Sequence, residues 1–328
     1  MRPIVLATRA LPEPSLSTLE PDFEVRVLGW APSAEELAVE VADADALITL
    51  VSDPVTEAVL EAGSKLRIVA NYGVGVDNID RVAAAARGIV VTHTPNVLTD
   101  ATADLTMALL LALSRRMIEG DRMVRAGGFA GWSPELLLGW ELKGKVLGIA
   151  GPGRIGRAVA HRARAFGLTV IAWGRSARDE NDPDDPPRVS FEELLRRADV
   201  VSLHLPLNDE TRHLFNRRAF ERMKPGAVLL NTARGALVEE AALVRALDAG
   251  TLAGAGLDVF ENEPSVAPAL LDDDRVVLMP HAGSATVETR REMARVVAED
   301  VRRVLTGEKP LRAVAEETGS RKRRGGER

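Results

Sequence analysis

A short apolar run that leads straight into three closely spaced glycines is the feature that most restricts the fold of this chain. The run is KVLGIA, and the glycines lie in GPGRIG, ahead of a segment of helical pattern at residues 157–166. Glycines allow close backbone approach, and a helix N-terminus presents free amides to an anion. A purely structural turn is the alternative, but a strand before and a helix after the glycines favour dinucleotide binding. The residues expected to contact the dinucleotide here are Gly151, Gly153, Arg154, Ile155 and Gly156.

Two series of apolar runs alternate with helical segments. The first series occupies residues 3–8, 23–29, 44–50, 66–73 and 88–94, and the second occupies 145–151, 168–174, 198–205, 226–233, 254–260 and 275–281. The runs lack the alternating polarity of half-exposed strands, which indicates parallel sheets covered on both faces. A length of 328 residues also exceeds what one hydrophobic core usually serves. We therefore predict an α/β protein with two doubly wound parallel-sheet domains.

Two further helices are predicted around the second series. Residues 99–116 contain no glycine or proline and are apolar on most faces, which is typical of a buried helix that connects domains. Residues 285–307 have apolar positions near helical spacing and end at a glycine. This last helix could return to the first domain and make that domain discontinuous.

Composition excludes several classes of protein and site. The absence of cysteine rules out a disulfide framework, a thiolate nucleophile and a cysteine-ligated metal, and it fits a cytoplasmic location. We expect no metal site. No apolar run reaches about 18 residues, so no membrane span is expected. A net charge of −6 argues against nucleic acid as a partner, although the basic cluster at 321–324 could touch it.

The end of the second strand of the second series bears on the choice of cofactor. An NAD-binding domain usually has an acidic residue there for the ribose 2′-hydroxyl, whereas this chain has Gly174, Arg175 and Ser176. Loss of the carboxylate removes repulsion, and a guanidinium binds phosphate well. NADPH is therefore the predicted cofactor, with NADH possible. The alternative is that Arg175 only stacks on adenine; Asp179 lies too far into a polar loop to replace the missing acid.

Three residues after apolar runs could carry chemistry. Arg234 follows AVLLNTA and could bind a carboxylate and polarise a carbonyl, and His281 follows RVVLMP and could exchange a proton. Glu263 in ENEP could hydrogen-bond His281 and fix its tautomer. Taken singly, each has an ordinary alternative: a surface arginine, a solvated glutamate and a structural histidine. Together they are typical of hydride transfer to a 2-oxo acid.

The chain resembles the D-2-hydroxyacid dehydrogenases, and most of all their glyoxylate/hydroxypyruvate reductase branch. The resemblance extends from about residue 3 to residue 310, through NYGVGVDNID, HTPNVLTDATADLTMALLLALSRR, GPGRIG, NTARGALV, GLDVFENEP and PHAGSAT. It implies a Rossmann cofactor domain, with its dimerisation arm, at residues 99–283. This domain would be inserted into a flavodoxin-like substrate domain at 1–98 and 284–315, with an active-site cleft between them. Separately from the resemblance, residues 316–328 have no apolar periodicity, which predicts a disordered tail.

The resemblance also assigns roles to residues. It implies that Arg234, Glu263 and His281 are catalytic, and that backbone amides of the Tyr72–Gly75 loop, at Val74 and Gly75, bind the substrate carboxylate together with Arg234. On the residues alone, the glycines of that loop would be an ordinary turn and Asp258 an ordinary turn residue or helix cap. The further cofactor contacts that it implies are Thr102, Thr232, Ala233, Asp258, His281 and Gly283.

Partners and substrates follow from the same resemblance. Residues 127–145 resemble the arm through which these enzymes form homodimers, and Trp132 and Trp140 could anchor it, although core packing is an equal alternative. Trp132 could also reach the neighbouring active site. The implied substrates are glyoxylate and hydroxypyruvate. The alternatives are D-lactate, 2-ketogluconate or phosphoglycerate with NAD, phosphite oxidation, and a nucleotide-sensing scaffold of the corepressor type.

Overall fold

The computed structural model of this chain describes residues 2–180, 182 and 185–315. The chain forms two compact units, which we call unit 1 and unit 2. Among the described residues, unit 1 comprises 2–98 and 285–315, and unit 2 lies within Thr99–Ser284. The tail predicted at 316–328 lies outside the described residues.

Unit 1 is built on a five-stranded parallel sheet in the order β2-β1-β3-β4-β5. The strands are β1 (Ile4–Ala7), β2 (Glu24–Val27), β3 (Ala46–Leu50), β4 (Ile68–Tyr72) and β5 (Val90–Thr92). The helices are α1 (Leu16–Leu19), α2 (Ala34–Glu40), α3 (Glu57–Ala62), α4 (Arg81–Ala86) and α12 (Val287–Leu305). The strand order reverses between β1 and β3, as in a doubly wound fold.

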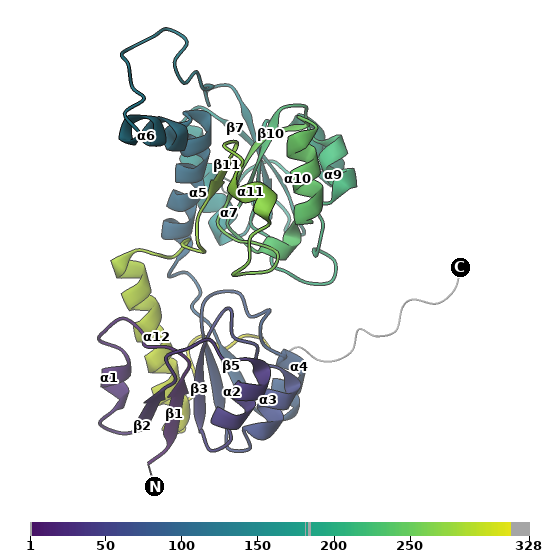
Figure 1. Cartoon of the computed structure of the whole chain (residues 1–328). Helices are drawn as coiled ribbons and strands as arrows, with labels where there is room; N and C mark the ends of the chain where they lie inside the picture. The colour runs from purple at the N-terminus through teal and green to yellow at the C-terminus, as the bar shows by residue number, and fades with distance from the viewer. Residues whose placement is uncertain (1, 181, 183–184, 316–328) are drawn as a thin grey trace. The chain divides into compact units, whose positions relative to one another are not determined.

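Both faces of this sheet are covered, as Figure 1 shows. On one face, side chains such as Val5 and Ile68 pack with helices α1 and α12, and on the other, Leu6 and Val69 pack with α2, α3 and α4. Helix α12 is further tied to β4, because the hydroxyl of Tyr72 donates to the carbonyl of Arg290 at 2.7 Å. Burial on both faces explains why the strands of this unit lack alternating polarity.

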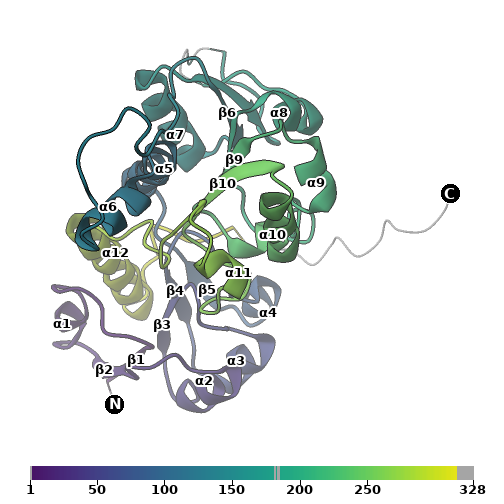
Figure 2. The ribbon, with the colours of Figure 1, turned by 45° about the horizontal axis from the view of Figure 1, so that its top comes forward.

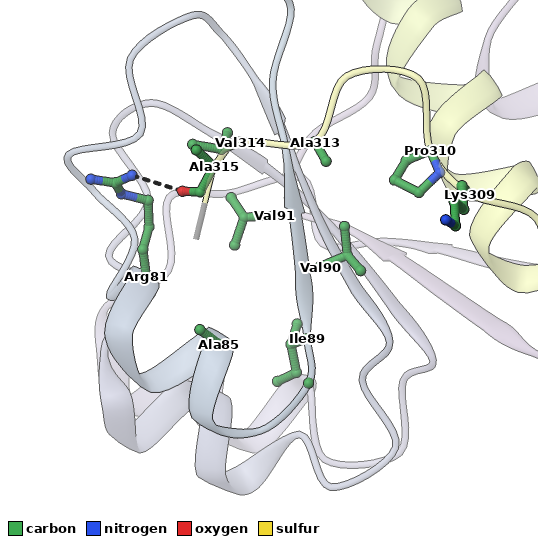
Figure 3. Close-up of a pocket in the computed structure, with 11 residues that line it drawn as sticks. Arg81, Ala85, Ile89, Val90, Val91, Lys309, Pro310, Ala313, Val314 and Ala315 are labelled. Carbon is green, nitrogen blue, oxygen red and sulfur yellow. Dashed lines mark hydrogen bonds between the residues drawn. The ribbon is translucent and has the colours of Figure 1, made fainter. Parts of the chain in front are cut away.

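The segment after α12 pairs with β5 and so covers that edge of the sheet. The amide of Val314 donates to the carbonyl of Val91 at 2.8 Å, and Thr92 and Ala313 form an antiparallel bridge. Figure 3 shows Val91, Ala313 and Val314 around a pocket, with Arg81 donating to the carbonyl of Ala315. Pairing of this kind satisfies backbone groups that an edge strand would otherwise leave exposed.

Unit 2 is built on a six-stranded parallel sheet in the order β11-β10-β9-β8-β6-β7. The strands are β6 (Val146–Ala150), β7 (Thr169–Trp173), β8 (Val200–Leu203), β9 (Ala227–Asn231), β10 (Leu252–Leu257) and β11 (Val276–Leu278). The helices are α5 (Thr99–Ser114), α6 (Met117–Arg125), α7 (Arg154–Ala165), α8 (Phe191–Arg197), α9 (Arg217–Arg222), the 3₁₀ turn η1 (Gly235–Leu237), α10 (Glu240–Asp248) and α11 (Pro268–Leu271). The predicted fold class, with two doubly wound parallel sheets, is confirmed.

Figure 2 shows the layers of unit 2. Helices α5 and α7 pack on one face of the sheet, and α8, α9 and α10 pack on the other. The chain reverses direction across the sheet between β6 and β8, so the turn after β6 lies at a switch point, where doubly wound sheets bind their ligands. Among the described helices, none combines the length and the apolar character needed to span a membrane.

Candidate active site

The glycine turn after β6 has a steric reason for two of its three glycines. Gly151 has a φ of +97°, and a Cβ added there would lie 2.6 Å from the carbonyl oxygen of His204. A Cβ at Gly156 would lie 2.4 Å from the carbonyl oxygen of Gly151. Neither position accommodates a side chain, because real Cβ atoms do not approach backbone oxygens so closely.

Gly153 differs, because a Cβ there would meet no protein atom within 4 Å. It is the N-cap of the 12-residue helix α7, and no side chain caps that end. Arg154 and Ile155 are the first two residues of the helix. An open, uncapped helix N-terminus at a switch point fits the pyrophosphate of a dinucleotide.

The loop after β7 presents a guanidinium where an acidic residue would favour NAD. Gly174 packs against Pro152, since an added Cβ would lie 2.6 Å from Pro152 Cδ, and Arg175 and Ser176 are exposed. Arg188 fixes the loop by donating to the carbonyl of Ser176 at 3.1 Å. The fully buried carboxylate of Asp185 accepts from Arg188 at 3.0 Å. The backbone of this loop is thus anchored, whereas the Arg175 side chain is accessible.

His281 and Glu263 form a close pair in unit 2. Nδ1 of His281 lies 2.8 Å from Oε2 of Glu263, and the other carboxylate oxygen accepts from the amide of Phe260 at 3.0 Å. Burial raises the pKa of Glu263, but the hydrogen bond and charge of His281, the Phe260 amide and the charge of Arg234 outweigh it, so the pKa is lowered overall. Glu263 is therefore ionised near neutral pH and accepts the Nδ1 proton, which leaves Nε2 available for other chemistry.

The backbone of His281 is held in an uncommon conformation. Its φ is +54°, in the left-handed region, and its amide donates to the carbonyl of Asp258 at 2.8 Å. The buried carboxylate of Asp258 accepts from the amides of Ala282 and Gly283 at 2.7 and 2.8 Å. Asp258 therefore shapes the loop that aims His281, and strained backbone of this kind is common at functional sites. Burial also raises the pKa of Asp258.

Arg234 lies in a loop that is fixed by its neighbours on β9. The side chain of Asn231 accepts from the amide of Ala233 at 3.1 Å and donates to the carbonyl of Arg234 at 2.8 Å. Arg234 is half-buried, and its Nη1 donates to the carbonyl of Ala233 at 2.8 Å. At Gly235 an added Cβ would lie 1.9 Å from the Phe260 backbone, so the Arg234 loop and the segment that leads to Glu263 pack backbone against backbone.

Threonines connect this loop to helix α5. Thr232 and Thr106 share a hydrogen bond of 2.9 Å between their hydroxyls, and the hydroxyl of Thr106 donates to the carbonyl of Thr102. A Cβ at Gly283 would lie 3.4 Å from the Thr102 hydroxyl and 3.2 Å from Asp258. The structure therefore brings Thr102, Thr232, Asp258 and Gly283 together within unit 2.

A second pair of a histidine and a carboxylate, which was not predicted from the sequence, links the segment that leads to Glu263 to its neighbours. Nε2 of His213 lies 2.6 Å from Oε1 of Glu261, and the other oxygen of Glu261 accepts from the amide of Glu240 at 3.0 Å. In return, Oε1 of Glu240 accepts from the amide of Glu261 at 2.7 Å. These residues lie far apart in the sequence, and only the position of Glu261 two residues before Glu263 could have drawn attention to the group.

Another histidine of unit 2 is unsuited to proton exchange. Burial lowers the pKa of His204 to about 3, and its Nε2 lies 2.8 Å from the hydroxyl of Ser202. It is therefore neutral near neutral pH. His281 is the one histidine that Glu263 orients.

The predicted substrate-binding residues Val74 and Gly75 belong to unit 1, in the loop that follows β4. Both residues are half-buried. Among the described residues, no cluster of three or more histidine, aspartate or glutamate side chains has the arrangement of a metal site.

Comparison with known proteins identifies the family. The model for the NAD-binding domain of the D-isomer specific 2-hydroxyacid dehydrogenases matches residues 107–283. A glyoxylate reductase from Thermococcus litoralis is 47% identical over 319 residues, which cover 94% of this chain and 96% of that protein.

Solved structures agree with this assignment. A Thermus thermophilus protein is 49% identical with a TM-score of 0.89, over 95% of this chain and 100% of that one. An NADPH-dependent glyoxylate/hydroxypyruvate reductase from Sinorhizobium meliloti, in complex with NADP and malonate, is 36% identical with a TM-score of 0.88, over 96% of this chain and 98% of that one. Since the family model matches more than half of the chain and these relatives align along almost all of it, the chain belongs to the D-isomer specific 2-hydroxyacid dehydrogenase family.

Proposed function

We propose that this chain reduces small 2-oxo acids, with glyoxylate and hydroxypyruvate as substrates, to D-2-hydroxy acids with NADPH. The observation that carries the proposal is the pair of His281 and Glu263 at 2.8 Å, with Arg234 close enough for its charge to lower the pKa of Glu263. The choice of substrate is supported by relatives that are named as glyoxylate reductases and align along nearly the whole chain.

The residues of unit 2 fit the cofactor. The open N-terminus of α7 at Gly153 suits the pyrophosphate, and the group of Thr102, Thr232, Ala233, Asp258 and Gly283 offers hydroxyl and carboxylate groups for the nicotinamide end. When bound, NADPH would supply the hydride that reduces the keto carbon of the substrate.

The side chains of unit 2 would supply the rest of the chemistry. Nε2 of His281 donates a proton to the oxygen that becomes the hydroxyl, and Glu263 holds the ring through Nδ1 and stabilises its charge. Arg234 binds the carboxylate of the 2-oxo acid and polarises its carbonyl. In unit 1, we propose the backbone amides of Val74 and Gly75 as ligands of the substrate carboxylate.

The preference for NADPH rests on the loop after β7. Arg175 is exposed there, and among the described residues no acidic side chain occupies positions 174–176. A guanidinium in this place would bind the 2′-phosphate of NADPH, whereas a carboxylate would repel it.

Initial rates with glyoxylate, hydroxypyruvate, pyruvate and 2-ketogluconate, each with NADPH and NADH, test the proposal. We expect fast oxidation of NADPH with glyoxylate and hydroxypyruvate. Fast turnover of pyruvate or 2-ketogluconate with NADH would instead favour a dehydrogenase of another D-2-hydroxy acid. Absence of turnover across the panel would reject the reductase and direct attention to phosphoglycerate, to phosphite or to a scaffold role.

We also propose that the chain forms a homodimer through α6 and the segment that follows it. Helix α6 buries none of its residues, and apolar side chains are exposed along this region. They are Met117, Ile118, Val124, Phe129, Trp132 and Leu138, with Trp132 84% exposed. An apolar surface of this extent is typical of an interface. Light scattering at micromolar concentration should give twice the 35.3 kDa mass of the chain, and a monomer would reject the proposal.

A further inference from the structure

The loop after β4 in unit 1 has three successive carbonyls that are each bound by a neighbour. The carbonyl of Gly73 accepts from the amide of Thr94 at 2.9 Å. The carbonyl of Val74 lies 2.9 Å from Nδ1 of His93, and the carbonyl of Gly75 accepts from Nδ2 of Asn71 at 2.6 Å. Two of these three partners are side chains, and both come from residues next to the loop in the sheet rather than from the loop itself.

Binding of the carbonyls fixes the direction of the amides. The peptide bonds of this loop are trans, and in a planar trans peptide the N–H points opposite to the carbonyl of the preceding residue. With the carbonyls of Gly73 and Val74 held toward β5 and its extension, the amides of Val74 and Gly75 point away from them. Within the described part of the chain, these two amides donate to no protein acceptor. Successive amides of this kind form an anion-binding nest.

The side chain of Asn71 is itself held in place. It is fully buried, and its Oδ1 accepts from Nδ2 of Asn78 at 3.4 Å. The same Nδ2 of Asn78 donates to the carbonyls of Leu50 and Asp53, both at 3.0 Å. The amide nitrogen of Asn71 therefore faces the loop, because its oxygen is used on the other side.

His93 is the more accessible of the two side chains that hold the loop. It follows β5 and is half-buried, and its backbone amide donates to the carbonyl of Arg312 at 3.3 Å. A carbonyl oxygen can only accept, so Nδ1 of His93 must carry the proton in its bond to Val74. The contact thus selects one tautomer of the ring and uses it to orient a single peptide group.

We propose that His93 is a positioning residue for substrate: it holds the carbonyl of Val74 so that the amide of Gly75 is presented to the carboxylate of the 2-oxo acid. Asn71 fixes the next peptide, between Gly75 and Val76, through the carbonyl of Gly75. This inference rests on the proposed function. It assigns to His93 a part in substrate affinity and none in proton transfer, which belongs to His281. Without the contact to Nδ1, the peptide group between Val74 and Gly75 is free to change its orientation, and the affinity for the substrate carboxylate falls.

Two substitutions of matched size separate this role from a structural one. His93→Asn keeps an N–H donor at the same number of bonds from Cα as Nδ1, whereas His93→Leu removes the donor and keeps the bulk. We expect His93→Leu to raise KM for glyoxylate, and Ki for the carboxylate inhibitor oxamate, about tenfold, which is the loss of one hydrogen bond. We expect kcat and KM for NADPH to stay within about twofold, and His93→Asn to restore KM to within about threefold.

Several results would overturn the inference. An unchanged KM for glyoxylate in His93→Leu, a parallel rise in KM for NADPH, a fall in kcat alone, or no rescue by asparagine would each reject it. If His93→Leu does not fold, His93→Gln, whose amide lies one bond further out, should give the same rise in KM. The wild-type protein is assayed first, which separates failure of the proposed function from failure of this inference. If the wild type does not reduce glyoxylate at all, the proposed function is rejected, and the inference is rejected with it.

Discussion

Units 1 and 2 share one design, a doubly wound parallel sheet, but they offer different chemical groups at the ends of their strands. In unit 1 the candidate groups are backbone amides, at Val74 and Gly75 after β4. In unit 2 they are charged side chains, among them His281 after β11 and Arg234 after β9. The same edge of the sheet therefore needs different support for each kind of group.

The support differs as the groups require. A backbone amide is aimed by fixing the carbonyl before it. In unit 1 the side chain of His93 does this for the amide of Gly75, and the backbone amide of Thr94 does it for the amide of Val74. A reactive side chain is aimed by fixing its loop, and unit 2 does this with Asp258 and the pair of His213 and Glu261. We therefore expect substitutions at His281 and in the glycine turn of unit 2 to act mainly on kcat or cofactor binding, and those around the β4 loop to act mainly on KM for the substrate.

The largest expected effect tests the side-chain chemistry of unit 2. His281→Ala should lower kcat by about 10² or more, because the general acid is lost, and should leave NADPH affinity within about twofold. Steady-state rates and a fluorescence titration with NADPH measure the two quantities. An unchanged kcat would remove His281 from the mechanism and would break the contrast between the units.

The second-largest expected effect is on stability and concerns the glycine turn after β6 in unit 2, where two positions have no room for a side chain. Gly156→Ala should lower the free energy of unfolding by about 1–3 kcal/mol, because the added Cβ meets the Gly151 carbonyl oxygen. Denaturant unfolding measures it.

Gly153→Ala is the matched control, since its Cβ meets no protein atom. It should change stability by less than about 1 kcal/mol while weakening NADPH binding, because the methyl group occupies space that the pyrophosphate needs. Equal losses of stability in both variants would show that the turn is not packed as described.

Arg175→Ala tests whether unit 2 prefers NADPH to NADH through this side chain. We expect KM for NADPH to rise about tenfold and KM for NADH to change by less than about twofold, because only NADPH carries the phosphate that the guanidinium would bind. Steady-state kinetics with both cofactors check this. Equal increases would mean that Arg175 does not distinguish them.

The smallest effect is the pH dependence of stability from Glu263. Its pKa is lowered from 4.5 in the folded chain, so its ionised form stabilises the fold above the unfolded pKa, and this contribution is lost as pH falls through the folded pKa. Glu263→Gln should therefore be less stable than the wild type near neutral pH, by no more than about 1 kcal/mol, and the difference should vanish in acid. Chemical unfolding of both proteins across this pH range would detect it, and a difference that grows in acid would contradict it.

Most of the fold could be predicted because it depends on local patterns. Each of the eleven predicted apolar runs overlaps one of the strands β1 to β11, although β10 begins at Leu252, two residues before its run, and the helix predicted at Phe191–Arg197 is α8. Helix α7 begins at Arg154 rather than near Arg157, so that Gly156, whose added Cβ would meet the Gly151 carbonyl oxygen, lies inside the helix. Helix α5 ends at Ser114 rather than near 116, since Arg116 has a left-handed backbone.

The candidate site could be predicted only in part. Arg234, Glu263 and His281 each follow or adjoin an apolar run, so their places at strand ends were visible, and the bond between His281 and Glu263 that was expected is present. The contacts of His93 with Val74 and of His213 with Glu261 were not visible, because they join residues from different loops with no periodic pattern. Contacts between different loops depend on the order of the strands in each sheet, and the identity of a single residue does not reveal that order.

The return of α12 to unit 1 has a consequence for how the chain folds as it is synthesised. Arg67, next to β4, donates to the carbonyl of Leu305, 238 positions later in the chain. The face of the first sheet that α12 covers therefore has only α1 packed on it, with apolar side chains such as Val5 and Ile68 incompletely buried, while all of unit 2 leaves the ribosome. Domains generally fold as units during synthesis. We expect unit 2, although it is the later part to be made, to complete its core first, and the oldest strands of the nascent chain to be the last to be buried.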